Sequence, residues 1–394
     1  MLIQASNELA AFVARVRASD VLAVDAEFMR ERTYYPRLCL LQLATDDEAV
    51  AVDPFGSADL GLLQPLMADP TVTKVFHAGA QDIEILNRVL GAPPAPVFDT
   101  QVAATLLGFS EQASYQDVVS SLLGVRLDKG QRFTDWSVRP LSPEQVAYAL
   151  DDVRHLPGLY RTMRARLESA GRLGWLAEEF ERMADPATYD VDPDAQYRRV
   201  KRASSLKGQQ LAVLREVAAW REVEAQRRDV PRRWLVPDET LVEIARRAPR
   251  TEAALGAVRG MSDQVARRHG RDILSAVERG LAVPREEWPT LPSRRRSEVR
   301  AEVVDLMAAL VRLRARQHGV APASLATRDD LEAFAAGDRS SPLASGWRHA
   351  MVGAELEGLL RGDVVLGVVD GEASVLPARF PSEGGLRDPE EDRE

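Results

Sequence analysis

Cysteine is nearly missing from this chain, which has one, Cys39, among 394 residues. A single cysteine excludes an intrachain disulfide and is typical of a reducing, cytoplasmic compartment. Because Cys39 stands in the apolar run 38–41, we expect its thiol to be buried rather than reactive. The five histidines and this cysteine show no spacing that is typical of a zinc site.

Long apolar runs are missing as well, and no stretch approaches the length of a membrane span. The N-terminus lacks the basic start and apolar core of a signal peptide. With 45% hydrophobic and 28% charged residues, the composition is typical of a soluble globular protein. The length predicts two to three domains.

The formal net charge of −9 argues against a nucleic-acid partner only at first sight. Cations that are bound by acidic residues invert the local electrostatic field. The distribution of charge along the chain therefore matters more than the net charge. Arginine is clustered in a way that can follow a phosphate backbone, although helix faces balanced by glutamate are the alternative. The clusters lie at 198–202, 227–228, 232–233, 246–247, 267–268 and 294–296.

Two acids, Asp25 and Glu27, interrupt the apolar run 21–28. In a β-strand alternate side chains share a face, so both carboxylates would point one way while Ala26 and Phe28 point the other. Buried carboxylates need compensation, and a hard divalent cation such as Mg²⁺ or Mn²⁺ provides it. The alternative is a strand end at which both acids reach solvent or an arginine.

A second acid signal follows the short apolar stretch that ends at Phe76. Gly79 allows a turn, and Ile83, Leu86 and Leu90 then recur at helical spacing. Asp82 is therefore expected in the first turn of a helix, where the helix dipole alone would favour an acid.

The third signal lies in the run 141–156. Ser142 followed by Pro143 predicts a helix start, so Tyr148 and Asp152 lie on one helix. At spacing i, i+4 the phenol and the carboxylate share a face, whereas Asp151 points elsewhere.

The order Asp-x-Glu, then Asp, then Tyr-x-x-x-Asp resembles the DEDD superfamily of 3′-5′ exonucleases, in its tyrosine branch. Asp25 and Glu27 match the first motif of that family, Asp82 the second, and Tyr148 with Asp152 the third. Flanking sequence in 28–36, 40–43, 97–101 and 128–136 agrees with the family.

The resemblance implies phosphodiester hydrolysis with two Mg²⁺ or Mn²⁺ ions, one activating the attacking water and one stabilising the leaving 3′ oxygen. It implies that Asp25 bridges both ions, that Glu27, Asp82 and Asp152 complete the metal ligands, and that Glu27 also touches the terminal 3′-hydroxyl. A phenol with its ordinary pKa of about 10 is a weak base at neutral pH, so we expect Tyr148 to orient the water. The products would be 5′-mononucleotides.

Further substrate contacts are expected from residues near the motifs. These are Phe28 and Met29 beside the acids, Gln42 on the next strand, and Lys129, Gln131 and Arg132 in a polar loop. Strand alternation favours core packing for Phe28. His77 and His155 are expected to pack or form hydrogen bonds rather than to act in catalysis.

The chain changes character near residue 190. Before it, predicted strands at 21–28, 38–44, 49–52 and 74–76 alternate with helices, the first three strands forming an antiparallel meander. This predicts a mixed α/β sheet flanked by helices, like the ribonuclease-H-like fold of the family. The predicted exonuclease domain is 1–190, followed by a linker at 191–205.

From Leu206 onward the pattern is helical. The segment 206–285 resembles an HRDC domain, a small all-α nucleic-acid-binding bundle, on the sequences 235–245 and 259–261, with Asp238 expected as a helix cap. After a linker at 286–296, residues 297–376 predict a second, diverged all-α HRDC-like bundle, in which Thr327 and Asp330 match a capping box. Residues 377–394 predict a disordered tail.

The resemblance implies RNA as substrate, with precursor tRNA 3′ ends the natural choice. The residues themselves do not discriminate RNA from DNA, because a 2′-hydroxyl contact needs geometry. An exonuclease acting on single-stranded DNA and a non-catalytic RNA-binding protein that uses its HRDC domains are therefore the alternatives. We expect no membrane association, no obligate protein partner and a monomer.

Overall fold

The computed structural model describes residues 1–127, 135–291 and 300–378. The chain divides into two compact units, one formed by Met1–Ala103 with Ala113–Ser293, the other by Ala104–Gln112 with Arg294–Glu394. Within the described ranges, no helix has both the length and the hydropathy that crossing a bilayer requires. The predicted tail lies almost wholly outside the described residues.

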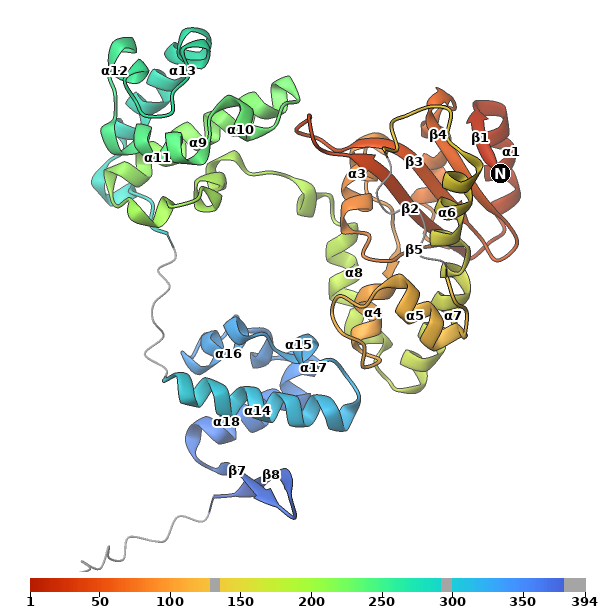
Figure 1. Ribbon diagram of the computed structural model, residues 1–394. Helices are drawn as coiled ribbons and strands as arrows, with labels where there is room; N and C mark the ends of the chain where they lie inside the picture. The colour runs from red at the N-terminus through yellow and green to blue at the C-terminus, as the bar shows by residue number, and fades with distance from the viewer. Residues whose placement is uncertain (128–134, 292–299, 379–394) are drawn as a thin grey trace, which may run out of the picture. The chain divides into compact units, whose positions relative to one another are not determined.

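A mixed six-stranded sheet organises the N-terminal part of the first unit, in the order β1-β4-β3-β2-β5-β6 (Figure 1). Strands β2, β3 and β4 form the predicted antiparallel meander, and β5 pairs with both β2 and β6 in parallel. Strand β1, parallel to β4, was not predicted, because four residues are too few to show alternation. The strands are β1 Leu2–Ala5, β2 Val21–Met29, β3 Arg37–Ala44, β4 Ala49–Ser57, β5 Thr73–Phe76 and β6 Val97–Asp99.

Helices pack on both faces of this sheet. On one face Leu9 and Phe12 of α1 and Ile83 of α3 join a core that includes Leu41 and Leu43 of β3. On the other face α6 covers β2, β3 and β4, where Leu150 packs with the buried Cys39, as predicted for the thiol. The helices are α1 Ser6–Val16, α2 Gln64–Met67, α3 Ala80–Leu90, α4 Thr100–Thr105, α5 Tyr115–Leu123, α6 Pro143–Arg154, α7 Leu156–Ser169 and α8 Ala177–Ala184.

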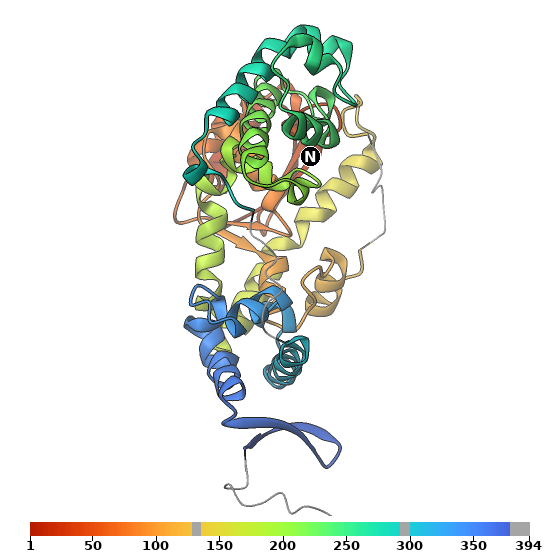
Figure 2. The same ribbon diagram turned by 90° about the vertical axis from the view of Figure 1, so that its left-hand side faces the viewer.

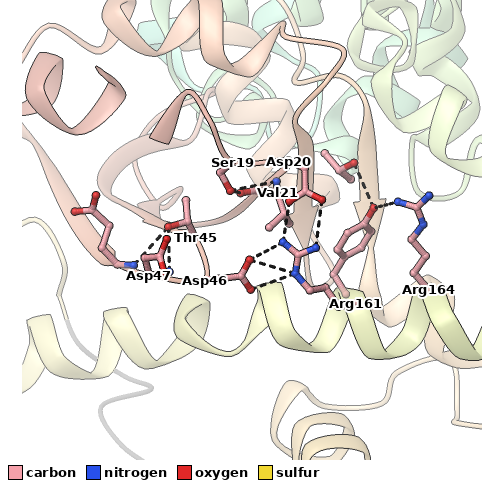
Figure 3. Close-up of polar contacts among 11 residues, drawn as sticks. Ser19, Asp20, Val21, Thr45, Asp46, Asp47, Arg161 and Arg164 are labelled. Carbon is pink, nitrogen blue, oxygen red and sulfur yellow. Dashed lines mark hydrogen bonds and ion pairs between the residues drawn. The ribbon is translucent and has the colours of Figure 1, made fainter. Parts of the chain in front are cut away.

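Arg161 ties helix α7 to the sheet through ion pairs (Figure 3). Its guanidinium donates to Asp20 Oδ1 at 2.7 Å, just before β2, and to Asp46 in the β3–β4 turn. The side chains of Arg161 and both acids are 43–62% exposed. Such exposed pairs contribute little to the free energy of folding.

A helical bundle with its own core completes the first unit. The long helices α9 and α13 pack on each other, and Leu214, Ile244 and Ile273 are fully buried between the helices. Tyr197 and Val200, from the stretch predicted as a linker, belong to this core. The helices are α9 Gln209–Arg228, α10 Arg232–Leu235, α11 Asp238–Arg247, α12 Glu252–Gly256 and α13 Asp263–Ala282.

The prediction that Asp238 caps a helix is wrong. Asp238 is the first helical residue of α11, and Pro237 precedes it at the cap position. The Asp238 carboxylate instead accepts from Lys201 N at 3.0 Å and from Arg221 Nη1 at 2.8 Å. A buried arginine nearby thus competes successfully for the carboxylate.

The second unit combines helices with a β-hairpin that follows α18 at the blue end of the chain (Figures 1 and 2). The predicted capping box is confirmed, since Thr327 Oγ1 accepts from Asp330 N at 3.2 Å. Its elements are α14 Ala301–His318, α15 Pro322–Leu325, α16 Arg328–Ala335, α17 Gly346–Arg348, α18 Ala354–Arg361, β7 Val364–Val369 and β8 Glu372–Pro377.

The hairpin corrects the prediction that residues 297–376 are all helical. Strands β7 and β8 are antiparallel, and Asp370 and Gly371 join them with φ values of 52° and 84°. Positive φ at both central residues defines the turn type that Asp-Gly favours. The valines on either side of this dipeptide carried a hairpin signal that the helical interpretation missed.

Candidate active site

The first pair of acids lies on β2 as predicted. Ala26 joins the core under α3, and Phe28 packs against the same core, so Asp25 and Glu27 face the opposite side of the sheet, toward α6. The register pairs Asp25 with Gln42 of β3 and Glu27 with Leu40. Both acids are half-buried.

Helix α6 brings the third motif to these acids. Ser142 caps it as predicted: its Oγ accepts from Gln145 N at 3.2 Å, and Gln145 Oε1 accepts from Ser142 N at 2.8 Å. One carboxylate oxygen from each of Asp25, Glu27 and Asp152 lies within 4.8 Å of the others. Residues about 125 positions apart in the sequence therefore meet in one acidic cluster.

Asp82 approaches from the start of α3, in the first helical turn as predicted. The preceding loop is held by Asp99, whose carboxylate accepts from Gly79 N at 2.8 Å and Ala78 N at 3.2 Å. A Cβ atom at Gly79 would lie 2.4 Å from Cβ of Phe76, so the close approach requires glycine. This loop fixes where α3 begins and hence where Asp82 lies.

The four carboxylates disfavour one another's charge. Burial raises the pKa of Glu27 to about 9, with further increases from Asp25, Asp152 and Asp82. Burial likewise raises the pKa of Asp25 to about 6. The pKa of Asp82 is raised well above its ordinary value by burial first and by the charge of Asp25 second.

This donor set fits divalent cations. Carboxylate oxygens are the ligands that Mg²⁺ and Mn²⁺ prefer. The raised pKa values mean that the ionised carboxylates lack a compensating positive charge, which a bound cation would supply. Gln42 adds a second observation. It is fully buried on the strand next to Asp25, and among the described residues neither its amide nitrogen nor its amide oxygen has a hydrogen-bond partner. An unpartnered buried amide beside a carboxylate is typical of a site completed by an ion and its water.

Tyr148 lies one turn before Asp152 on α6, and its ring stacks on Trp136 with the centroids 6.4 Å apart. Trp136 is buried and belongs to a loop clamped by Arg139. The Arg139 guanidinium donates to Asp53 Oδ1 at 2.8 Å, to the Cys39 carbonyl at 2.6 Å and to the Trp136 carbonyl at 2.7 Å. This clamp sets the entry into α6.

The remaining residues that were predicted to contact substrate do not all lie near the acids. Met29 and Tyr148 both pack against the buried cluster that contains Trp136, whereas Phe28 packs against the core on the other face. Lys129, Gln131 and Arg132 lie outside the described residues. His77 is a hydrogen-bonding residue as predicted, with Nδ1 at 2.9 Å from Thr100 Oγ1 and Nε2 at 3.1 Å from the Ala113 carbonyl.

Sequence reasoning missed Tyr115, the first residue of α5. Its pKa is raised mainly by burial, and also by the charges of Asp152 and Asp25, which places it near the acidic cluster. Its hydroxyl donates to the Asp151 carbonyl at 3.4 Å. A tyrosine directly after the N-cap Ser114 gives no signal of this proximity in the sequence.

Comparison with known proteins agrees with this geometry. Residues 1–168 match a family model described as 3′-5′ exonuclease, and residues 210–277 match the HRDC domain. Ribonuclease D of Granulibacter bethesdensis is 42% identical over 372 residues, covering 93% of this chain and 94% of that protein. Ribonuclease D of Gluconacetobacter diazotrophicus is 42% identical over 382 residues, covering 96% and 97%.

Among solved structures, that of Escherichia coli RNase D, described as an exoribonuclease involved in structured RNA processing, is similar with a TM-score of 0.79. Its sequence is 30% identical, and the match covers 92% of this chain and 98% of that one. With its exonuclease and HRDC domains, and with relatives of this identity along nearly its whole length, the chain belongs to the ribonuclease D family of metal-dependent 3′-5′ exoribonucleases.

Proposed function

We propose that Asp25, Glu27, Asp82, Tyr148 and Asp152 are the catalytic residues, and that the four carboxylates hold two divalent ions, Mg²⁺ or Mn²⁺. The observation that carries this proposal is the convergence of Asp25, Glu27 and Asp152 within 4.8 Å. When bound, such ions lower the pKa of a water and neutralise charge on the scissile phosphate.

The protein groups then have separate tasks. Tyr148 shares a face of α6 with Asp152 and is held by Trp136, which suits its hydroxyl to orient the attacking water rather than to remove its proton. Glu27 lies two residues along β2 from Asp25 and is the candidate contact for the terminal 3′-hydroxyl. Attack on the last phosphodiester bond releases one 5′-mononucleotide per cycle.

We propose precursor tRNA 3′ ends, in the cytoplasm, as the substrate of a monomeric enzyme. Support comes from the HRDC domain and from the similarity to an exoribonuclease that acts on structured RNA. Among the remaining candidate contacts, Met29 is the best placed to touch a terminal base, since it packs against the same buried cluster as Tyr148. Gln42 is buried and would act through Asp25 rather than on the base.

We also propose that the second unit is a diverged HRDC-like domain. Helices α14, α15 and α16 repeat the order of α9, α10 and α11: a long helix, a four-residue helix and a third helix. Both long helices end at a left-handed residue, Asp229 with φ 51° and Gly319 with φ 60°. The amides of Asp229 and Gly319 donate to carbonyls three and four residues back in the same way.

Adjacent acids on α6 offer a matched test of the catalytic set. Asp152→Asn should lower the turnover of a 3′-extended RNA by more than ~100-fold, because it removes a metal ligand. Asp151→Asn makes the same chemical change at an exposed residue paired with Arg154, and should leave turnover within about twofold of wild type. Tyr148→Phe should reduce kcat by ~10- to 100-fold with little change in KM. Equal losses in Asp151→Asn and Asp152→Asn would contradict the assignment.

A further inference from the structure

A cleft of about 1460 Å³ lies within the first unit, outside the acidic cluster. One wall comes from the end of β2, the loop that follows it and α3; the other comes from α9, α10 and the start of α11, with the stretch 188–201 between them. Its volume exceeds that of the pockets that bind small ligands, which favours a segment of a polymer as its occupant.

The two walls of this cleft are joined by specific hydrogen bonds. The Tyr34 hydroxyl accepts from Gln226 Nε2 and from Arg232 Nη2, each at 3.1 Å, and it donates to Glu222. The backbone amides of Tyr34 and Tyr35 donate to Asp229 Oδ1 at 3.1 and 3.0 Å. The cleft is therefore shaped by a fixed polar contact.

The lining charges favour an anion. Seven of the lining residues are Lys or Arg and five are Asp or Glu. Three of these acids are paired with lining arginines: Glu84 with Arg30, Glu222 with Arg232, and Asp238 with Arg221. Arg199, Lys201 and Arg233 are exposed, and no ion pair is recorded for their side chains within the described ranges.

Trp234 adds an aromatic surface to these cations. It belongs to α10, lines the cleft and is 53% exposed, although an indole is normally well buried. Arginines interleaved with an exposed aromatic ring are the combination that binds single-stranded nucleic acid, the cations following phosphates and the ring stacking on a base.

The cleft begins near the catalytic acids. Arg30 stands directly after β2 and follows Glu27 by three residues, about 10 Å along an extended chain. Glu84 follows Asp82 by two residues on α3. A strand whose 3′ end reaches the acids would enter this cleft within a few nucleotides.

We infer that this cleft binds the single-stranded RNA segment directly upstream of the 3′-terminal nucleotides, with Trp234 stacking on a base and Arg233 contacting a phosphate. The inference rests on the exoribonuclease function and adds to it the place where the body of the substrate is held. Both side chains are exposed, so their replacement should not disturb folding.

The test measures binding and turnover separately on the full chain. In EDTA, anisotropy of a labelled single-stranded 12-nucleotide RNA should show affinity reduced ~5- to 100-fold in Trp234→Ala. Arg233→Ala should weaken binding and reduce the slope of log K against log salt by about 0.7. Val223→Ala and Arg250→Ala replace exposed residues of the same bundle that do not line the cleft, and should bind like wild type.

With metal added, Trp234→Ala should raise KM by the same factor while kcat at saturating RNA stays within about twofold. Wild-type affinity in Trp234→Ala would overturn the inference, and so would losses of affinity in the two control variants equal to those in Trp234→Ala. The cleft would then be a candidate binding site for a protein partner instead. A wild-type chain that binds the RNA through Trp234 but never cleaves it would instead contradict the catalytic assignment, so the two failures are distinguishable.

Discussion

At the scale of single residues, Glu27 makes the acidic cluster sensitive to pH. Its raised pKa of about 9 means that the metal-free folded protein holds a proton that the unfolded chain, with an ordinary glutamate, releases above about pH 4.5. The free energy of unfolding therefore falls as pH rises between these two values. Below pH 4.5 both states are protonated and the effect disappears.

Glu27→Gln keeps the shape of the protonated acid but removes its titration. In EDTA the variant should melt several degrees above wild type at pH 8, and at nearly the same temperature at pH 4.5. Addition of Mn²⁺ at pH 8 should reverse the order, because only wild type gains the full metal site. Thermal melts at the two pH values check this, and a wild type more stable than the variant in EDTA at pH 8 would contradict it.

Gln42 makes a second prediction at this scale. Because both amide atoms are buried without a partner in the part of the chain that the structure describes, Gln42→Leu should raise the free energy of unfolding in EDTA by about 1–2 kcal/mol. If the amide supports Asp25 or a metal-bound water, the same change should lower kcat about 10- to 100-fold. Urea denaturation and turnover are measured on one preparation. Unchanged turnover would mean that Gln42 contributes only to packing and does not support Asp25 or a metal-bound water.

Strand alternation predicted that Asp25 and Glu27 share a face, and helix spacing predicted the same for Tyr148 and Asp152. That these two pairs form one site was implied only by the family resemblance. Trp136, Tyr115 and Arg139 could not be assigned in this way. Their positions depend on contacts between distant segments, such as the bond from Arg139 to the Cys39 carbonyl, and no local pattern encodes these.

At the scale of elements, two arginines that tie helices to the sheet allow a paired prediction. Arg139 holds the entry of α6 through Asp53, whose side chain is 2% exposed. Arg139→Met would leave that carboxylate buried and uncompensated, so it should cost about 3–5 kcal/mol and should lower kcat by displacing α6. Arg161→Met removes the exposed pairs on α7 and should cost about 0–1 kcal/mol.

Urea denaturation of the two variants gives the comparison directly. Equal losses of stability would mean that burial does not determine how much these ion pairs contribute to the free energy of unfolding. If Arg139→Met is destabilised but keeps the wild-type kcat, then Arg139 stabilises the loop without determining the positions of Tyr148 and Asp152.

The meander of β2, β3 and β4 and helices α3 and α6 were predictable because long apolar periodicity and a serine–proline start dominate those segments. The short strand β1 gave no alternation to detect, since it gains its stability from pairing with β4. The β7–β8 hairpin could have been predicted from Asp370 and Gly371. It was missed because the helical pattern before it was extended through this segment.

At the scale of the whole molecule, we infer that catalysis and RNA binding belong to different parts of the chain. The sheet presents the acids, while the helical bundle of the first unit contributes Trp234 and most of the exposed cations of the cleft. The net charge of −9 is compatible with RNA binding because part of the acidic charge is gathered in a cluster that could hold a metal ion. Composition alone predicted neither the cleft nor its position, since the cleft depends on how Tyr34 meets α9.

The most direct measurement is a time course of wild-type protein on a 3′-extended tRNA and on a matched single-stranded DNA, with Mg²⁺, with Mn²⁺ and with EDTA. We predict stepwise release of 5′-mononucleotides from the 3′ end of the RNA, complete loss of release in EDTA, and recovery when metal is returned. RNA that is bound but left intact under both metals, or cleavage that persists in EDTA, would contradict a metal-dependent exoribonuclease built on Asp25, Glu27, Asp82 and Asp152.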